Sequence, residues 1–308
     1  MPKKFDVVVV GSVNADLVVG VERRPAPGET VLGSDLATYP GGKGANQAVA
    51  AARLGGRVGI LARIGGDGHG GLLRDALAEA GVDLGHLLVT EGPSGVALIT
   101  VGPDGDNSII VSPGANARLT PDDVARAREM IASAAVVSFQ LEVPVPTVLA
   151  AARAACDAGA RVVLNLSPPA PVPGELLALC DPLVVNEHEA AFLLGREGRT
   201  GAEAERRTPS AVAEALLERG PRSVVVTLGG DGALAADASG TIAVAAPKVE
   251  VVDTTGAGDA FTAALCLRLA HGDPLKDAVR YATRVGAAAV RESGAQSSYP
   301  TADDELPL

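Results

Sequence analysis

The stretch FDVVVVGSVNAD, residues 5–16, decides the fold because it joins a short apolar run to a glycine and several polar residues. Four consecutive valines favour a strand buried on both faces, which is the environment of a parallel sheet covered by helices. Asn14 and Asp16 fall just beyond this strand. Ligands of such sheets bind outside the carboxyl ends of the strands, so the stretch predicts a strand and a site together.

The same alternation of apolar β-branched runs and Ala/Leu-rich helical patterns continues along the chain. It predicts an α/β fold: one domain over residues 1–308, with a doubly wound, mostly parallel sheet flanked by helices. Strands are predicted at 5–10, 57–62, 135–139, 161–165, 182–185 and 223–227, with a last β segment at 249–252. Helices are predicted at 43–54, 70–80, 121–132, 145–158, 187–195, 209–219, 257–271 and 274–291.

Two segments break this rhythm. Residues 17–33 and 95–111 resemble hairpins with Pro/Gly turns and no helix between their strands. They predict a small separate sheet, built from about 12–38 and 95–112, that serves as a lid and offers a surface for dimerisation. Residues 196–209 are polar and predict a solvated loop.

Composition excludes several classes of protein. The net charge of −11 argues against a nucleic-acid or anionic-membrane surface. Neither the start of the chain nor any other stretch is apolar enough to predict a membrane span. Cys156, Cys180 and Cys266 are scattered, which favours buried thiols in a reducing cytoplasm. The four histidines have no metal-ligand spacing, so no zinc site is predicted.

Polar residues follow several predicted strands, and the fold would bring them to one crevice. A single polar residue after a strand is usually a helix cap, and Asn186 taken alone fits that role. Carboxylates and amides after five different strands are harder to explain as caps. They are Asn14 and Asp16, Glu142, Asn186 and Glu189, Thr227 and Gly229, and Asp259.

The loop DTTGAGDAF, residues 253–261, combines an anion site with a carboxylate. Gly256 and Gly258 allow the backbone close to a ligand, and the helix that starts near Ala257 adds its positive end. A phosphoryl group held there would leave Asp259 to accept a proton from an attacking alcohol. The alternative is that Asp259 only caps its helix, which leaves the paired glycines unexplained.

A second glycine loop, YPGGKGANQ at 39–47, contains Lys43 and Asn46. It lacks the Ser/Thr and the glycine spacing of a Walker A loop. Glycine with a polar amide suits hydroxyl recognition, although a flexible helix start is the alternative.

A third glycine cluster permits a different class of function. Gly66, Gly68 and Gly71 match the dinucleotide pattern G-x-G-x-x-G, which would make the chain an NAD-dependent oxidoreductase. Asp67 would then lie inside the pyrophosphate loop, so we favour a tight turn. For a nucleotide enzyme, Mg²⁺ carried by the nucleotide is the expected metal, with Glu189 helping to hold it through water.

Seven motifs together resemble the ribokinase family of carbohydrate kinases, which also includes adenosine kinase and fructokinase. The likeness runs nearly end to end and in order. The motifs are GSVNAD (11–16), GGKGANQAVAA (41–51), QLEVP (140–144), NEHEA (186–190), TLGGDG (227–232), DTTGAGDAF (253–261) and GAQSSYP (294–300).

The resemblance implies transfer of the γ-phosphate of ATP to the 5-hydroxyl of D-ribose, by a homodimer that associates through its lid sheet. It implies Asp259 as the base beside an anion hole at Gly256, Ala257 and Gly258. Matching sugar positions are Asn14, Asp16, Gly42, Lys43, Asn46, Glu142 and Asp259. Matching nucleotide positions are Asn186, Thr227, Gly229, Gly232, Gly258 and Thr283. An activating monovalent cation, usually K⁺, would lie at Asp253, Thr255, Ala289, Glu292, Gly294 and Ser298.

Other substrates remain open within this resemblance. A kinase of another small sugar or of a nucleoside is the first alternative, although aromatic residues to hold a base are few. A sugar-binding regulator that has lost catalysis is the second, and the intact Asp259 loop argues against it.

Overall fold

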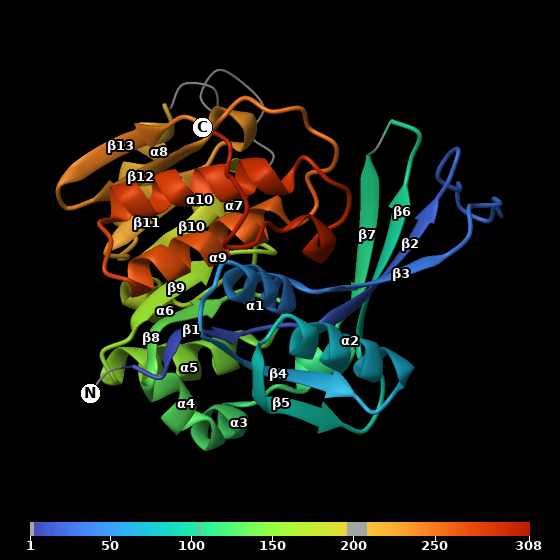
Figure 1. Cartoon of the computed structure of the whole chain (residues 1–308), viewed down its shortest axis with the longest axis horizontal. Coiled ribbons are helices and arrows are strands. Elements are labelled where there is room, and N and C mark those ends of the chain that lie inside the picture. The colour runs from blue at the N-terminus through green and yellow to red at the C-terminus, as the bar shows by residue number, and fades with distance from the viewer. Residues whose placement is uncertain (1–2, 105, 196–207) are drawn as a thin grey trace.

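A nine-stranded sheet lies at the centre of the computed structural model, which describes residues 3–104, 106–195 and 208–308 (Figure 1). All neighbouring strands pair in parallel except β12, which pairs antiparallel with both β11 and β13. The predicted doubly wound, mostly parallel sheet is therefore confirmed. Its order is β13 (Gly240–Val244), β12 (Ala233–Asp237), β11 (Ser223–Thr227), β10 (Leu183–Asn186), β9 (Arg161–Asn165), β8 (Ala134–Phe139), β1 (Phe5–Val10), β4 (Val58–Gly65) and β5 (Asp83–Thr90).

Helices cover both faces of this sheet, and the alternating side chains of β1 show why. Val7 and Val9 join one buried core, whereas Val8 and Val10 join the other. The first core includes side chains of α1 (Lys43–Arg53), α2 (Gly68–Glu79), α9 (Ala257–Ala270) and α10 (Leu275–Ala289). The second includes side chains of α3 (Pro121–Arg126), α4 (Arg128–Ala132), α5 (Val145–Asp157), α6 (Gly174–Leu179), α7 (Glu187–Leu193) and α8 (Pro209–Leu217).

The strand order reverses at β1. From β1 the chain passes to β4 and β5 on one side, and β8 to β11 extend the sheet on the other. Loops that leave the carboxyl ends of β1 and β8 therefore diverge, which opens a crevice between them. The short 3₁₀ turns η1 (Gly114–Arg118), η2 (Gly229–Asp231) and η3 (Gln296–Ser298) complete the regular structure of the described residues.

A separate four-stranded sheet stands off the main one (Figure 1). Its order is β3 (Ala37–Gly41), β2 (Asn14–Gly20), β6 (Gly95–Val101) and β7 (Asn107–Ser112). β6 and β7 form the hairpin expected at 95–111. The hairpin expected at 17–33 is wrong, because β2 pairs with 37–41 and only the bridge Val21–Gly33 lies between them. Pro25 and Pro27 in this connection have no N–H to donate to a ladder.

Other differences from the expected elements also have physical causes. Residues 249–252 form no strand, because the Val252 and Asp253 N–H groups donate to Val290 O at the end of α10. Asp259 therefore does not follow a strand of the sheet. The strands β5, β12 and β13 and the helix α6 were not expected. β5 is a partly exposed edge strand in which Gly and His interrupt the apolar residues, and β12 is rich in alanine, which has little strand preference. Ala127 divides the helix expected at 121–132 into α3 and α4.

Most of the loop predicted at 196–209, residues 196–207, lies outside the described residues. Within the described part of the chain, no helix is both long and apolar enough to cross a membrane.

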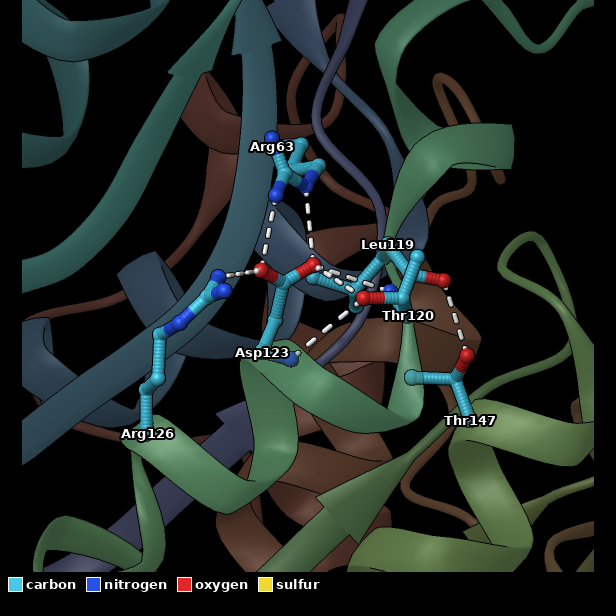
Figure 2. Close-up of polar contacts among 6 residues, drawn as sticks. All are labelled: Arg63, Leu119, Thr120, Asp123, Arg126 and Thr147. Atoms are coloured by element: carbon cyan, nitrogen blue, oxygen red, sulfur yellow. Dashed lines mark hydrogen bonds and ion pairs between the residues drawn. The ribbon is translucent and has the colours of Figure 1, made fainter.

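A buried ion pair joins α3 to β4 (Figure 2). The Asp123 carboxylate is fully buried and accepts two hydrogen bonds from the Arg63 guanidinium, at 2.9 and 2.7 Å. Arg126 adds a third contact, and Thr120 forms a capping box with Asp123. Burial alone would raise the pKa of Asp123, but the donors from Arg63 and Thr120 lower it.

We expect Asp123→Ala to lower the free energy of unfolding by about 3 kcal/mol, because it leaves the Arg63 cation without its partner. Urea unfolding measures this change. The exposed pair Arg153–Glu175 is the control, and Glu175→Ala should hardly move the urea midpoint. Equal effects of the two substitutions would contradict the structural role of Asp123.

Candidate active site

A cleft of about 210 Å³ opens where β9, β10 and β11 end, against the start of α9. Many of the predicted site residues line it together, although they are far apart in the sequence. A wider hollow of about 370 Å³, at Lys248, Glu250 and Arg291, contains none of them. The lining of the cleft is Lys43, Asn165, Ser167, Val184, Asn186, Glu189, Thr227, Thr254, Gly256, Gly258, Asp259 and Thr262.

The glycine loop before α9 has the backbone that its sequence predicts. Gly256 is the N-cap of α9 with φ 74°, a left-handed conformation that disfavours a side chain, and a Cβ there would meet Tyr299 and Ala295. Because Gly256 has no side chain, none caps the helix, and the helix end keeps its attraction for an anion. The Ala257 N–H donates to Thr254 O at 3.3 Å, so this one of the three predicted anion-hole amides is engaged within the loop.

Asp259 lies in the first turn of α9 and is 6% exposed. It is not the cap of its helix, since the N-cap is Gly256. Its Oδ2 accepts from Asn46 Nδ2 at 3.0 Å, and its Oδ1 accepts from Gln47 Nε2 at 3.1 Å. Burial raises the pKa of Asp259, although the Lys43 charge and the two amides oppose that rise. The result is a basic carboxylate at the edge of the cleft.

The second glycine loop presses α1 against the start of β2. Gly42 is the N-cap of α1 with φ 86°, and a Cβ on it would collide with the backbone of Val13 and Asn14. This close approach places Lys43 at the cleft. Burial lowers the pKa of Lys43, but the negative charges of Asp259 and Glu142 outweigh it and the pKa rises, so Lys43 stays cationic.

Hydrogen bonds fix the side chains of Glu142 and Asn14, two of the residues predicted to bind the sugar. Glu142 Oε2 accepts from Ser12 Oγ at 2.5 Å and from the Lys43 N–H at 3.1 Å. Asn14 is 2% exposed, and its Oδ1 accepts from Asn116 Nδ2 at 2.7 Å. Asn116 also binds the N–H and the carbonyl of Val13, so it fixes the orientation of the Asn14 amide.

Asp16 brings a third carboxylate to the same place from the small sheet. Its register partners Tyr39 and Ala97 put it on one face of that sheet, and a Cβ on Gly41 would collide with its carboxylate. Burial, with repulsion from Glu142 and Asp259, raises the pKa of Asp16 to about 7. The charges of Asp16, Lys43, Glu142 and Asp259 therefore lie close enough to act on one another.

Of the residues predicted to bind the nucleotide, some line the cleft and others do not. Asn186 caps α7, as its simplest interpretation suggested: it accepts from the Glu189 N–H at 2.8 Å, and Glu189 Oε2 accepts from the Asn186 N–H at 2.8 Å. Both residues, with Thr227, still line the cleft. Thr283 is 5% exposed and donates to Val279 O of its own helix.

Two nucleotide positions are glycines with positive φ, at 55° for Gly229 and 103° for Gly232. A Cβ on Gly232 would collide with Val244 O, so this turn needs a glycine. Its tightness keeps η2 beside the end of β11, next to the cleft.

The predicted cation positions form a pair of loops joined by Asp253. Its Oδ1 accepts from the Thr255 N–H at 2.9 Å and its Oδ2 from the Gly294 N–H at 2.8 Å. Burial raises the pKa of Asp253, but these backbone donors outweigh burial and lower it. The Asp253 carboxylate thus ties the loop before α9 to the loop after α10. The Ser298 hydroxyl donates to Ala295 O. No group of three or more His, Cys, Asp or Glu side chains among the described residues is placed to hold a metal ion.

The alternative prediction, a dinucleotide-binding loop at Gly66, Gly68 and Gly71, is wrong because the end of its helix is not free. Asp67 is the N-cap of α2, and its carboxylate accepts from the Gly70 N–H at 2.9 Å and from Ser94. The helix end that would bind a pyrophosphate is already occupied by this side chain.

Several residues of the site were missed in the sequence. Ser167, Thr254 and Thr262 line the cleft directly, and their hydroxyls gave no signal in the sequence. The other missed residues are five amides that hydrogen-bond to site residues or to one another, Gln47, Asn116, Gln140, Asn165 and Gln296, and the buried phenol Tyr299. Only Gln47, beside Asn46 in an alanine-rich helix, carried a signal: two adjacent amides in a buried helix require partners.

Comparisons with known proteins agree with this geometry. Residues 4–302 match the family described as pfkB family carbohydrate kinase. The chain is 39% identical to a protein named ribokinase from Schizosaccharomyces pombe, over 96% of this chain and 95% of the relative. It is 36% identical to a ribokinase from Haemophilus influenzae, over 97% of this chain and 96% of the relative.

Solved structures are similar over the same length. A ribokinase from Thermotoga maritima has a TM-score of 0.87 at 33% identity, with 96% of both chains covered. A ribokinase from Arabidopsis thaliana, solved as a complex with ribose and ATP, has a TM-score of 0.86 at 34% identity and covers 98% of this chain and 97% of its own.

The half-buried Asp16 carboxyl predicts a stability that depends on pH. Its ordinary pKa of 3.8 applies to the unfolded chain and about 7 to the folded chain, so the folded chain binds the extra proton between these values. The free energy of unfolding should therefore fall as pH rises from about 4 to about 7. Without ligand, Asp16→Asn should raise the Tm at pH 8 by roughly 2 °C or more relative to its effect at pH 4. Thermal unfolding at both pH values measures this, and equal Tm differences would contradict it.

Proposed function

The chain belongs to the pfkB family of carbohydrate kinases, and from that membership we propose that it transfers the γ-phosphate of ATP to the 5-hydroxyl of D-ribose. The products are D-ribose 5-phosphate and ADP. One observation carries the proposal: Asp259, in the first turn of α9 beside the free helix end, points its basic carboxylate at the Asn46 and Gln47 amides of α1. The full-length relatives named ribokinase support ribose as the sugar.

Asp259 acts as the general base in this reaction. It accepts the proton of the 5-hydroxyl while the hydroxyl oxygen bonds to the γ-phosphorus, and the bond from that phosphorus to the β,γ-bridging oxygen breaks. The amides of Gly256, Ala257 and Gly258 hold the charge that develops on the transferred group. Ala257 must exchange its hydrogen bond to Thr254 O for one to the phosphoryl oxygen.

The sugar is bound by residues that converge from three elements. Asn14 and Asp16 come from β2, and Gly42, Lys43 and Asn46 come from the start of α1. Glu142 follows β8. Polar groups of both charges suit a molecule with many hydroxyls, and a nucleoside base would find no aromatic surface in the lining of the cleft.

ATP occupies the side of the cleft formed by Asn186, Thr227, Gly229 and Gly232, with Thr283 nearest the base. Mg²⁺ fits this side because the Glu189 carboxylate lies there, already bound to the Asn186 N–H, and would hold the ion through water. The ion neutralises phosphate charge. K⁺ fits the loops at Asp253, Thr255, Ala289, Glu292, Gly294 and Ser298, and its effect would reach the anion hole through Thr255.

The four-stranded sheet serves as the lid and as the dimer interface. Ile99 and Ile109 share the Asp16 face of the sheet and would cover the sugar, whereas Leu98 and Ile110 lie on the opposite face. Leu98 is 47% and Ile110 69% exposed, and such an apolar face favours a second copy. Sedimentation of Ile110→Asp against the parent chain tests the dimer. The free thiols fit a cytoplasmic location.

A coupled assay of ADP release over a panel of sugars and nucleosides tests the substrate. We expect ribose to give the highest kcat/KM, and K⁺ to raise the rate over a sodium buffer. A higher kcat/KM for a nucleoside or another sugar would replace ribose as the substrate. Reduction of NAD without ADP release would contradict a kinase.

We expect Asp259→Asn to lower kcat about a thousandfold, because the amide cannot accept the proton. Ribose should still bind, with a Kd within about fivefold of the parent value by calorimetry, since the other sugar contacts remain. The new amide at position 259 would point its N–H₂ group at the N–H₂ group of Asn46 or of Gln47, which would destabilise the fold. The Tm of the variant is therefore measured alongside. Near-normal turnover in a folded variant would remove Asp259 from the chemistry.

A further inference from the structure

The Asp259 carboxylate is held on both sides, and only one of the two amides that hold it has a predicted role. Asn46 belongs to the sugar-binding set. Gln47, the next residue of α1, donates from Nε2 to Asp259 Oδ1 at 3.1 Å and is 1% exposed. Gln47 is not among the residues that line the cleft, so it acts on a ligand through its neighbours: Asp259 and, by a longer contact of 3.4 Å, Asn165 Oδ1.

The orientation of the Gln47 amide is fixed at its other end. Gln47 Oε1 accepts from Ser138 Oγ at 2.8 Å and from Gln140 Nε2. Rotating the Gln47 amide by half a turn would set an N–H₂ group against the Gln140 N–H₂ and an oxygen against the Asp259 carboxylate. Only one orientation satisfies all three neighbours, and in it Nε2 points at Asp259.

The orientation of the Gln47 amide is accompanied by an unpaired polar atom on Gln140. Its Oε1 is one of two buried side-chain polar atoms without a hydrogen-bond partner among the described residues. It lies against the backbone of Gly11, where a Cβ would collide with it. An unpaired buried acceptor destabilises a folded chain, and here it accompanies the donor that Gln140 presents to Gln47.

The surroundings of Asp259 make such a donor important. The charged and titratable groups that act on it are Lys43 from α1, Glu142 after β8, Asp16 from β2 and Tyr299 after η3. Burial and the Glu142 charge raise the pKa of Asp259, whereas Lys43, Asn46 and Gln47 lower it. Lys43 and Asn46 belong to the predicted sugar-binding set, so a bound sugar would compete for them. Gln47 is outside that set, so its hydrogen bond to Asp259 would remain when the sugar binds.

We propose that Gln47 is a positioning residue for the phosphoryl transfer, which fixes the rotation of the Asp259 carboxylate and favours its ionised form. This inference rests on the proposed role of Asp259 as general base. With Oδ1 bound to Gln47, the carboxylate cannot turn away from the cleft when the sugar engages Asn46. The chain Ser138–Gln47–Asp259 thus connects β8 to α9 through α1.

The test is Gln47→Met, which keeps the length of the side chain and removes its amide. We expect kcat with ribose and ATP to fall about 30-fold at pH 7, with both KM values within about threefold of the parent. The acidic limb of the profile of kcat/KM against pH should move up by about one pH unit, and turnover should partly recover at high pH.

Thr147→Val is the matched control. Thr147 is also buried and donates to Leu119 O at 2.8 Å (Figure 2), and its helix α5 packs on the face of the main sheet opposite to α9. It should lower the Tm without moving the pH profile. If Gln47→Met does not fold, Ser138→Ala provides the second test: loss of its hydrogen bond to Gln47 Oε1 should lower kcat about fivefold and shift the same limb in the same direction.

A folded Gln47→Met with the parent pH profile and kcat, or a Ser138→Ala variant with both unchanged, would overturn the inference. A loss of activity explained by KM alone would overturn it too. These results leave the proposed function standing as long as Asp259→Asn is inactive. If Asp259→Asn is active, the proposed function itself fails.

Discussion

The hydrogen bonds from Asn46 and Gln47 to Asp259 are the contact on which the site depends, because they join parts of the chain that are 213 and 212 residues apart. α1 brings Lys43 and the glycine loop from the N-terminal part, and α9 brings its helix end from the C-terminal part. The two helices pack in one core on the same face of the sheet. In the proposed reaction, one carboxylate therefore joins the residues that recognise the alcohol and those that recognise the phosphate, which come from opposite ends of the chain.

The site brings together acids whose pKa values are raised, in contrast to the buried Asp123 elsewhere in the fold. Asp123 is as buried as any of them, yet paired guanidinium groups and a capping box lower its pKa. The pKa values of Asp16, Glu189 and Asp259 are all raised, chiefly by burial, and Lys43 is the cation common to them. Such a cluster costs stability without a ligand, which is usual where a protein maintains reactive groups.

The sequence predicted the sheet and the convergence of its loops, because buried parallel strands carry a strong apolar pattern and their carboxyl ends must meet. It missed elements whose stability comes from neighbours, such as the edge strand β5 and the alanine-rich β12. Many residues that line the cleft were predicted, since glycines and carboxylates in loops are conspicuous, but Asn165, Ser167, Thr254 and Thr262 were not. Gln140 and Asn116 were not, because an amide that orients another amide has no sequence pattern of its own.

The small sheet is continuous with the pocket that it covers. β2 begins at Asn14 and β3 ends at Gly41, so both strands enter the main body at the sugar-binding residues. Asp16 belongs to this sheet, and Asp259 belongs to the main body. A ligand that touches both carboxylates thereby restricts the angle between the two sheets. If the small sheet closes over the sugar as proposed, affinity for the sugar and closure of the crevice are one thermodynamic quantity, and a mutation that stiffens the junction at Gly41 and Gly42 changes both together.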